Sequence, residues 1–323
     1  MESKFLRLLN DWQQDFPCVA EPFSVLGKEV GMEAEETLGA FRLWYKKGLL
    51  SRIGPVFNQN YFGASALVAL AVPRDRLEAV ASYINVMPEV NHNYEREHYF
   101  NLWFVVIASS KVHLQDLMVE ITSNTGLVPI VLPMEEAYHI NLGFDLLGQQ
   151  ADRAQQEAVV TPLRYVVEGF EKTLLHAIQD GIPLVARPYE EIGKRVGLLG
   201  SEVCEILEKW LSLGVLRRFS VVLRHHELGY TANAMCVWDV ADGDVTSIGM
   251  LLGAEPGVTL CYRRRRALPH WRYNLFCMIH GKGREEVLAK RIEISRRLAL
   301  DDWPHDVLFS SRRFKQCGAR FST

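Results

Sequence analysis

The chain contains the same module twice, and this internal repeat constrains its fold more than any local pattern does. A set of identical residues recurs with the same spacing 166 positions later, from Pro22 and Pro188 through to Arg52 and Arg218. Its members in the first copy are Pro22, Gly27, Lys28, Val30, Gly31, Trp44, Gly48, Leu50 and Arg52. Because repeated sequence folds into repeated structural units, we expect the 323 residues to form two related halves with a pseudo-symmetric interface.

Each copy opens with a helical part that ends in a short strand. Apolar residues recur there at helical spacing, and Pro22 and Pro188 each precede a short helix that stops at a glycine. A longer amphipathic helix and a strand-like run follow in both copies. Three short helices followed by a wing-like strand predict a winged helix-turn-helix over residues 1–60 and again over residues 166–226.

The rest of each copy follows the order β-α-β-β-α-β, in which helices cover one face of an antiparallel sheet. The fold class is therefore α+β, with ferredoxin-like domains over 61–148 and 227–323 and a polar linker over 149–165. In the first copy we expect strands at 64–72, 89–95, 102–108 and 128–132, with helices at 74–85 and 112–125. In the second copy we expect strands at 232–240, 257–263, 273–279 and 307–310, with helices at 245–252 and 285–298.

Composition narrows the class of protein further. A net charge of −3 gives no overall reason to expect a nucleic acid or an acidic membrane as partner. The charged N-terminus does not resemble a secretory signal, and apolar runs such as residues 64–72 are far too short to span a membrane. The six cysteines include no Cys-x-x-Cys pair, and several lie in strand-like apolar runs. This usage predicts buried free thiols in a reducing cytoplasm.

A helix-turn-helix joined to a ferredoxin-like domain is similar to the Lrp/AsnC transcription regulators, over almost the whole of each half. That resemblance would imply a ligand-responsive repressor. The candidate recognition helices, however, are acidic: the first begins Glu33-Ala34-Glu35-Glu36, and the second carries Glu202, Glu205 and Glu208 with one basic residue, Lys209. These glutamates either favour the helix N-terminus and a solvated face or repel DNA phosphates. Either way the helices are poor DNA readers, so no DNA partner is expected.

One segment of the first copy is rich in histidine. On a strand, period two places His92, Tyr94, Arg96 and His98 on one face. Imidazole can bind a metal or deliver a proton near neutral pH, and arginine can hold a carboxylate with two hydrogen bonds. The alternative is a solvated hairpin in which the histidines form local hydrogen bonds.

The equivalent segment of the second copy carries arginines instead. Tyr262 aligns with Tyr94, and the run Arg263 to Arg266 follows it, flanked by His270, Trp271 and Tyr273. Alternate arginines, such as Arg263 and Arg265, would share a strand face and could clamp several carboxylates. A solvated or structural run, or a phosphate-binding one, is the alternative reading.

These two segments resemble the siroheme decarboxylases. The first reads Asn-His-Asn-Tyr-x-Arg-x-His-x-x-Asn-Leu-Trp-Phe from Asn91. The second reads Val-Thr-Leu-Cys-Tyr-Arg-Arg from Val258 and then Leu-Pro-x-Trp-x-Tyr-Asn-Leu-Phe-Cys-Met-Ile-His-Gly from Leu268, like the partner subunit of the haem d1 pathway. Arg313-Phe314-Lys315-x-x-Gly318 also fits, whereas Arg272 stands where a proline is expected. The likeness spans nearly the whole chain and implies a fused two-subunit enzyme of Lrp-like ancestry.

The resemblance implies conversion of siroheme to 12,18-didecarboxysiroheme, without an added cofactor, in haem d1 or alternative haem biosynthesis. It implies His92 and His98 as catalytic residues that divide proton delivery, arm positioning and contact with the substrate iron, and no other metal. The expected carboxylate and substrate contacts are Tyr94, Arg96, Arg52, Arg218, Tyr262, Arg263 and Arg265. Partners would be the tetrapyrroles and a second copy or related subunits. The alternative is an Lrp-like regulator that senses haem or another tetrapyrrole without altering it.

Overall fold

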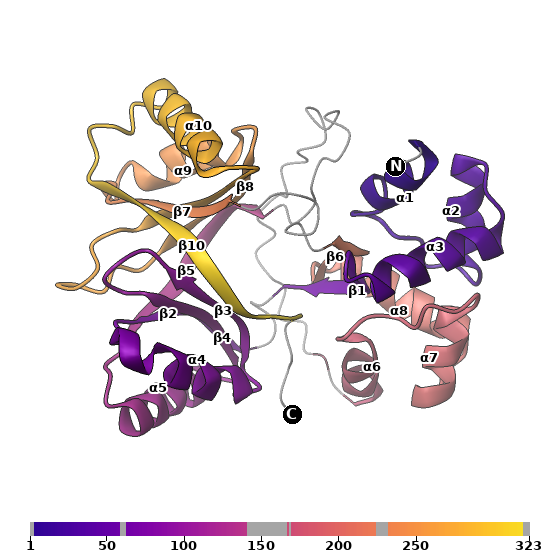
Figure 1. Cartoon of the computed structure of the whole chain (residues 1–323). Coiled ribbons are helices and arrows are strands. Elements are labelled where there is room, and N and C mark those ends of the chain that lie inside the picture. Colours follow the sequence, from indigo (N-terminus) through magenta and orange to yellow (C-terminus); the bar gives the residue numbers. More distant parts are fainter. Residues whose placement is uncertain (1–2, 59–62, 141–166, 168, 224–231, 319–323) are drawn as a thin grey trace. The chain divides into compact units, whose positions relative to one another are not determined.

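The structure is a computed structural model that describes residues 3–58, 63–140, 167, 169–223 and 232–318. The chain forms two compact units (Figure 1), one from residues 1–61 and 142–228 and the other from residues 62–141 and 229–323. Each unit therefore combines one part of each copy of the repeat. The linker predicted over 149–165 lies outside the described residues.

The first unit holds the two helix-turn-helix modules. In both modules the second helix ends at a glycine in the left-handed region, Gly31 with φ of 67° and Gly197 with φ of 74°. The elements are α1 (Ser3–Asn10), α2 (Pro22–Val30), α3 (Ala34–Lys46), β1 (Leu50–Phe57), α6 (Phe170–Ile178), α7 (Pro188–Val196), α8 (Gly200–Ser212) and β6 (Leu216–Leu223). The strands predicted as wings pair with each other, with Gly54 opposite Ser220, and so join the two modules in one antiparallel ribbon.

The second unit contains both of the predicted ferredoxin-like halves. In the first half the elements are β2 (Ala64–Leu70), the 3-10 helix η2 (Arg74–Arg76), α4 (Leu77–Val86), β3 (Val90–Arg96), β4 (Leu102–Ala108), α5 (Lys111–Thr125) and β5 (Ile130–Ile140). In the second half they are β7 (Ala232–Trp238), α9 (Val245–Gly253), β8 (Val258–Arg264), β9 (Leu275–Gly281), α10 (Arg284–Arg297) and β10 (His305–Gln316).

The halves are closed into one barrel by exchange of their last strands. The strand order is β10-β3-β4-β2-β5-β8-β9-β7. Strand β5 pairs with β2 of its own half and then with β8 of the other half, and β10 pairs with β7 and then with β3. The sequence predicted β5 and β10 as short strands that end at Leu132 and Ser310, and these ends were wrong. Their extensions form the two seams between the halves.

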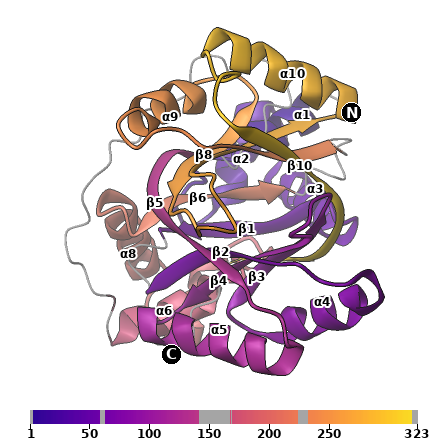
Figure 2. The same ribbon diagram turned by 90° about the vertical axis from the view of Figure 1, so that its left-hand side faces the viewer.

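The strands bury side chains on two faces. Helices α4 and α5 cover the first half's sheet on one side of the barrel, and α9 and α10 cover the second half's sheet on the other (Figure 2). A third cluster fills the barrel interior with residues of both halves, including Trp103, Leu132, Tyr262, Trp271 and Leu308. A side chain that leaves β3 or β8 therefore points either to a helix layer or into this shared interior.

Candidate functional site

An asparagine clamp fixes the hairpin that carries the candidate residues in each half. The Asn101 side chain accepts a hydrogen bond from the Val72 amide at 2.8 Å and donates one to the Val72 carbonyl at 2.9 Å. Asn274 makes the same two bonds with Val240, both at 2.9 Å. Asn101 and Asn274 thus hold equivalent hairpins in the same position relative to their sheets.

Strand β3 presents His92, Tyr94 and Arg96 along one face, as the alternation predicted. The His92 and Tyr94 rings are nearly parallel with centroids 6.3 Å apart, and the Arg96 guanidinium lies 5.7 Å from the Tyr94 ring. Asn93, between them, points to the helix layer and donates to the Ala81 carbonyl. Burial raises the pKa of Tyr94, partly opposed by Arg96 and Arg313, so the phenol keeps its proton.

His98 does not continue this strand face, because β3 ends at Arg96 and His98 lies in the following turn. Its Nδ1 accepts a hydrogen bond from the Phe100 amide at 2.9 Å, and its Nε2 lies 3.6 Å from Asp306 Oδ2. An Nδ1 that accepts a bond leaves the proton of the neutral ring on Nε2. Burial lowers the pKa of His98, although Asp306 opposes this. The predicted group of four on one strand is therefore corrected to three plus a turn histidine.

Two buried arginines occupy equivalent positions in the halves, and the sequence reasoning identified one of them. Arg96 and Arg264 are each 7% exposed. Arg96 Nη1 donates to the Leu308 carbonyl at 3.0 Å, and Arg264 Nη1 donates to the Leu132 carbonyl at 2.8 Å. Within the described residues neither forms an ion pair with a carboxylate, and burial lowers the pKa of both. A buried cation without a counter-charge is costly, so this pair favours an anionic ligand.

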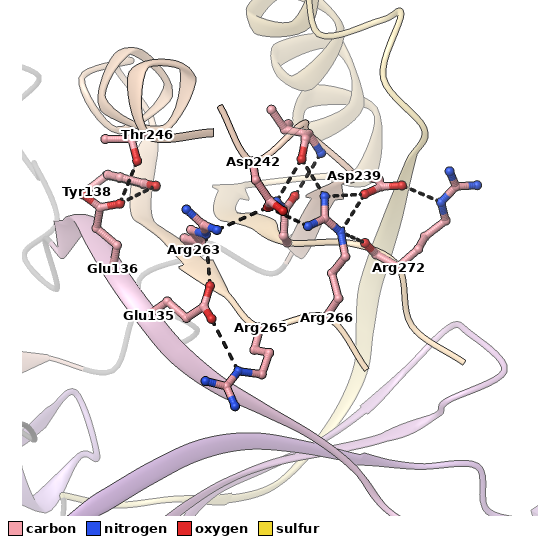
Figure 3. A network of polar contacts seen from close by, with 12 residues as sticks. Glu135, Glu136, Tyr138, Asp239, Asp242, Thr246, Arg263, Arg265, Arg266 and Arg272 are labelled. Atoms are coloured by element: carbon pink, nitrogen blue, oxygen red, sulfur yellow. Dashed lines mark hydrogen bonds and ion pairs between the residues drawn. The ribbon is translucent and has the colours of Figure 1, made fainter. Parts of the chain in front are cut away.

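Arg264 takes the interior position that the sequence suggested for its neighbours. Tyr262 lies in the interior cluster, and the Arg264 guanidinium is 4.5 Å from its ring. Arg263 instead forms ion pairs with Glu135 at 3.0 Å and Asp242 at 3.2 Å (Figure 3). Arg265, 71% exposed, contacts the same Glu135 at 3.4 Å. Arg263 and Arg265 do share a side, as predicted, but it is the side away from Tyr262.

That outer side carries an open depression of about 660 Å³ lined by Met134, Glu135, Glu136, Arg263 and Arg265. Its arginines are already matched by acidic groups, so it presents no excess of positive charge. The two signs of charge alternate through Asp242, Arg266, Asp239 and Arg272 (Figure 3). Four arginines in a row therefore do not form the cationic clamp that the sequence suggested.

Aromatic side chains of both halves meet beside the histidine turn. Trp271, 2% exposed, lies 4.9 Å from Trp103, 5.0 Å from Tyr273 and 5.4 Å from His98, measured between ring centroids. Trp103, Arg264 and Asp306 were not predicted. Arg264 could have been found, because the spacing of 168 that aligns Tyr94 with Tyr262 also aligns Arg96 with Arg264. Asp306 carries no such signal, since only the barrel closure brings it to His98.

Arg52 and Arg218 belong to the helix-turn-helix unit, in β1 and β6. Arg52 Nη2 donates to the Pro55 carbonyl at 3.2 Å, and Arg218 Nη1 donates to the Gln13 carbonyl at 2.7 Å. Arg52 thus bonds within its own strand, and Arg218 bonds the segment that follows α1. Their predicted role in substrate binding remains a prediction.

Cysteines are a further class of reactive side chain in the described part of the chain. The six cysteines are free, and Cys236, Cys261 and Cys277 are buried. No three His, Cys, Asp or Glu side chains among the described residues gather as a metal site. None of the described helices combines the length and hydropathy that crossing a membrane requires.

Models of known protein families match both the helix-turn-helix part and the ferredoxin-like part of each copy. The family model of the siroheme decarboxylase NirDL-like helix-turn-helix domain matches residues 6–50 and 171–217. The model of the AsnC-like ligand binding domain matches residues 62–139 and 227–315. A siroheme decarboxylase NirDL subunit of Paracoccus pantotrophus is 37% identical over 99% of this chain and 97% of its own length.

The chain belongs to the siroheme decarboxylase family. A solved siroheme decarboxylase NirDL in complex with an iron-uroporphyrin III analogue superimposes with a TM-score of 0.72 at 33% identity, covering 99% of this chain and 94% of that one. A siroheme decarboxylase NirD subunit of Stutzerimonas stutzeri is 50% identical over 43% of this chain and 92% of its own length. Family members thus include single chains of both halves and separate subunits of half the size, as the resemblance implied.

Proposed function

We propose that this chain decarboxylates siroheme, converting two acetate arms to methyl groups and yielding 12,18-didecarboxysiroheme. The observation that carries the proposal is the pair of buried guanidinium groups, Arg96 and Arg264, that face the barrel interior without a carboxylate partner in the described residues. A substrate with eight carboxylates would supply the missing negative charge. The solved relative bound to an iron-uroporphyrin analogue supports a carboxylate-rich macrocycle as the ligand class.

The surroundings of these arginines suit such a macrocycle. Tyr94 and Tyr262 lie against the two guanidinium groups, and Trp103 and Trp271 add apolar surface between the halves. Pockets for large planar ligands combine apolar walls with a few fixed polar groups. Arg96 and Arg264 would hold carboxylates that the reaction retains, because a bidentate charge-assisted bond fixes position.

In the reaction the bond between the acetate methylene and its carboxyl carbon breaks, carbon dioxide leaves, and the electron pair stays on the methylene carbon. The ring delocalises that charge until a proton forms the new C–H bond. His92 and His98 are the proposed catalytic residues, and they divide proton delivery, arm positioning and contact with the substrate iron. His92 lies beside the Tyr94 phenol, whereas His98 lies between Asp306 and Trp271.

The environment of His98 suits a proton donor that charges only when substrate arrives. Burial favours the neutral form of the free imidazole by lowering its pKa. Substrate carboxylates beside it would act with Asp306 to raise that pKa again, so the ring would take up a proton and become an acid close to the reacting arm. Arg263 and Arg265 would bind carboxylates only in competition with Glu135.

Further parts of the proposal follow from the family. The reaction needs no added cofactor, the iron arrives with the substrate, and the chain works in the cytoplasm within haem d1 or alternative haem biosynthesis. A second copy of the chain or related subunits are the proposed protein partners, and no DNA partner is proposed because the first turn of α3 and most of α8 carry glutamates.

Anaerobic incubation with siroheme, followed by mass spectrometry of the tetrapyrrole, tests the proposal. Two successive losses of carbon dioxide are expected. Tight binding with unchanged ligand mass would instead identify a tetrapyrrole sensor and refute the enzymatic proposal. The H92A and H98A variants, compared with wild type under the same conditions, should fold normally and lose turnover.

A further inference from the structure

Apart from the contact between His98 and Asp306, the ion pairs that join the two halves among the described residues share one polarity. Among the described residues, each Lys or Arg ion pair between halves takes its carboxylate from the first half and its cation from the second. The carboxylates are Glu21, Glu78, Glu95, Glu97 and Glu135, and the cations are Arg187, Arg263, Arg265, Arg284 and Arg312. If charges were distributed at random over these contacts, each half would supply the carboxylate in some ion pairs and the cation in others.

One of these pairs joins a position to its own counterpart. Arg187 lies 166 residues after Glu21, the spacing of the repeat, and each residue immediately precedes the equivalent helix, α7 or α2. Arg187 Nη2 and Nε lie 2.7 and 3.0 Å from Glu21 Oε1. Two like halves assembled in this way would bring Glu against Glu, or Arg against Arg.

The barrel seams repeat this arrangement. In the seam of β3 and β10, Arg312 is opposite Glu95 and lies 3.5 Å from its carboxylate. In the seam of β5 and β8, Glu136 is opposite Arg263, and Glu135 bonds Arg263. Strands β5 and β10 are equivalent in the repeat, but β5 carries Glu136 where β10 carries Arg312. In an assembly of two like halves, β5 would pair with β3 and β10 with β8, so glutamates would face Glu95 and Arg312 would face Arg263.

Side-chain size distinguishes the seams as well. Tyr138 of β5 lies so close to Gly249 of α9 that a Cβ there would approach the ring to 2.1 Å. At the equivalent places, Phe314 of β10 packs against the cluster that contains Ala81 of α4. If β5 packed against a helix with alanine at this position, the Tyr138 ring would overlap the alanine Cβ. Helix α4 of the first half carries such an alanine, Ala81.

We propose that these positions form a pairing code by which each half accepts only the unlike half. Exposed ion pairs are individually weak, so discrimination comes from the whole set together with the Tyr138–Gly249 fit. The code matters for the site, because Arg96 and Arg264 each bond a carbonyl on the strand received from the other half. It rests on contacts within the fold, so it stands or falls independently of the decarboxylase proposal.

Charge reversal in the full chain tests the code at one pair in each unit, Glu21–Arg187 and Glu97–Arg284. The E21R/E97R variant makes both halves basic there, and R187E/R284E makes both acidic. We expect each to lower the thermal midpoint by about 3 °C and to refold from urea partly into assemblies of higher mass, measured by light scattering. The variant E21R/E97R/R187E/R284E, with reversed polarity, should regain the wild-type midpoint to within about 1 °C and the wild-type mass.

The matched control is E29R/D116R, which makes the same change in net charge at exposed helix positions away from the seams. It should leave the midpoint and the refolded mass at their wild-type values. The losses in the double variants should also shrink in about 1 M salt, which screens exposed charges. The code is refuted if either double variant refolds to wild-type mass and midpoint, or if the fourfold variant is no better than the doubles.

Discussion

The β3–β4 and β8–β9 hairpins are held by the same asparagine clamp, yet they expose different chemistry. Both present a tyrosine and a buried arginine to the barrel interior, Tyr94 with Arg96 and Tyr262 with Arg264. Two positions before each tyrosine the hairpins differ, with His92 in one and Leu260 in the other. The shared arginine therefore indicates a need common to both halves, whereas the histidine marks the half where protons can be moved.

The turns that follow differ too. The first turn places His98 beside Asp306, whereas the second, longer by five residues, carries Trp271 into the space between the halves. Arg263 and Arg266 of the second hairpin form ion pairs with Glu135, Asp239 and Asp242. Under the proposed function, duplication kept an anion-binding frame in both copies and divided the remaining tasks between them. The experiments below test this division.

The largest effect is expected from the histidines. Replacing His92 or His98 by alanine should lower kcat by about 10²–10⁴-fold, the usual contribution of a positioned acid or base. The control is L260A at the position equivalent to His92, which should keep most activity. Turnover of siroheme followed under anaerobic conditions measures this, and equal losses in H92A and L260A would contradict the division between the hairpins.

Next in size is the loss of an interior arginine. R264M should lower kcat/KM by about 10–100-fold, because a charge-assisted bond to a carboxylate contributes roughly 1.5–3 kcal/mol. The same variant should raise the thermal midpoint of the ligand-free protein, since it removes a buried charge that has no carboxylate partner among the described residues. Steady-state kinetics and thermal unfolding give the two readouts. A lower midpoint with unchanged kcat/KM would show Arg264 to be a structural residue.

A smaller effect concerns stability of the barrel seam. G249A should destabilise the protein by about 1–3 kcal/mol, because its Cβ would overlap the Tyr138 ring. The matched control is G39A, also in a helix, where a Cβ meets nothing within 4 Å and better helix propensity should stabilise slightly. Denaturant unfolding compares the two, and equal behaviour would remove the size element of the pairing code.

The pH dependence of stability tests the environment of His98, in the turn that follows β3. The pKa of His98 in the folded chain lies below its ordinary value of 6.5, so below that pH the unfolded chain binds a proton that the folded chain does not. Stability should therefore fall as the pH drops from about 6.5 towards the folded pKa. His139, whose pKa burial also lowers, should add to the slope. The H98Q variant should show a shallower fall in urea midpoints, and an unchanged slope would contradict the assignment.

The smallest effect is expected from the outer arginines. Arg265 is mostly exposed and contacts Glu135, so R265M should lower kcat/KM by about threefold or less, the range of an exposed ion pair. The comparison with R264M, one position away, uses the same assay. A larger loss in R265M than in R264M would move the carboxylate site to the outer side of β8.

The fold could be predicted from the sequence as far as local order reaches. Helix ends at Gly31 and Gly197 and the β-α-β-β-α-β order follow from spacing and glycine chemistry, and the structure confirms them. The extensions of β5 and β10 could not be predicted, because the strands that satisfy their backbone hydrogen bonds lie in the other half. A run such as residues 133–140 has no apolar alternation that marks it as a strand by itself.

The candidate site divides in the same way. Sequence by itself determined the duplication, the family and the alternation that places His92, Tyr94 and Arg96 on one face, because each depends on residue order along one segment. Only the tertiary structure decided that Arg264 faces inward while Arg263 faces outward, and that Asp306 meets His98. The physical reason is that a side chain's charge partner and its burial are set by strands distant in the chain, here those exchanged between the two halves.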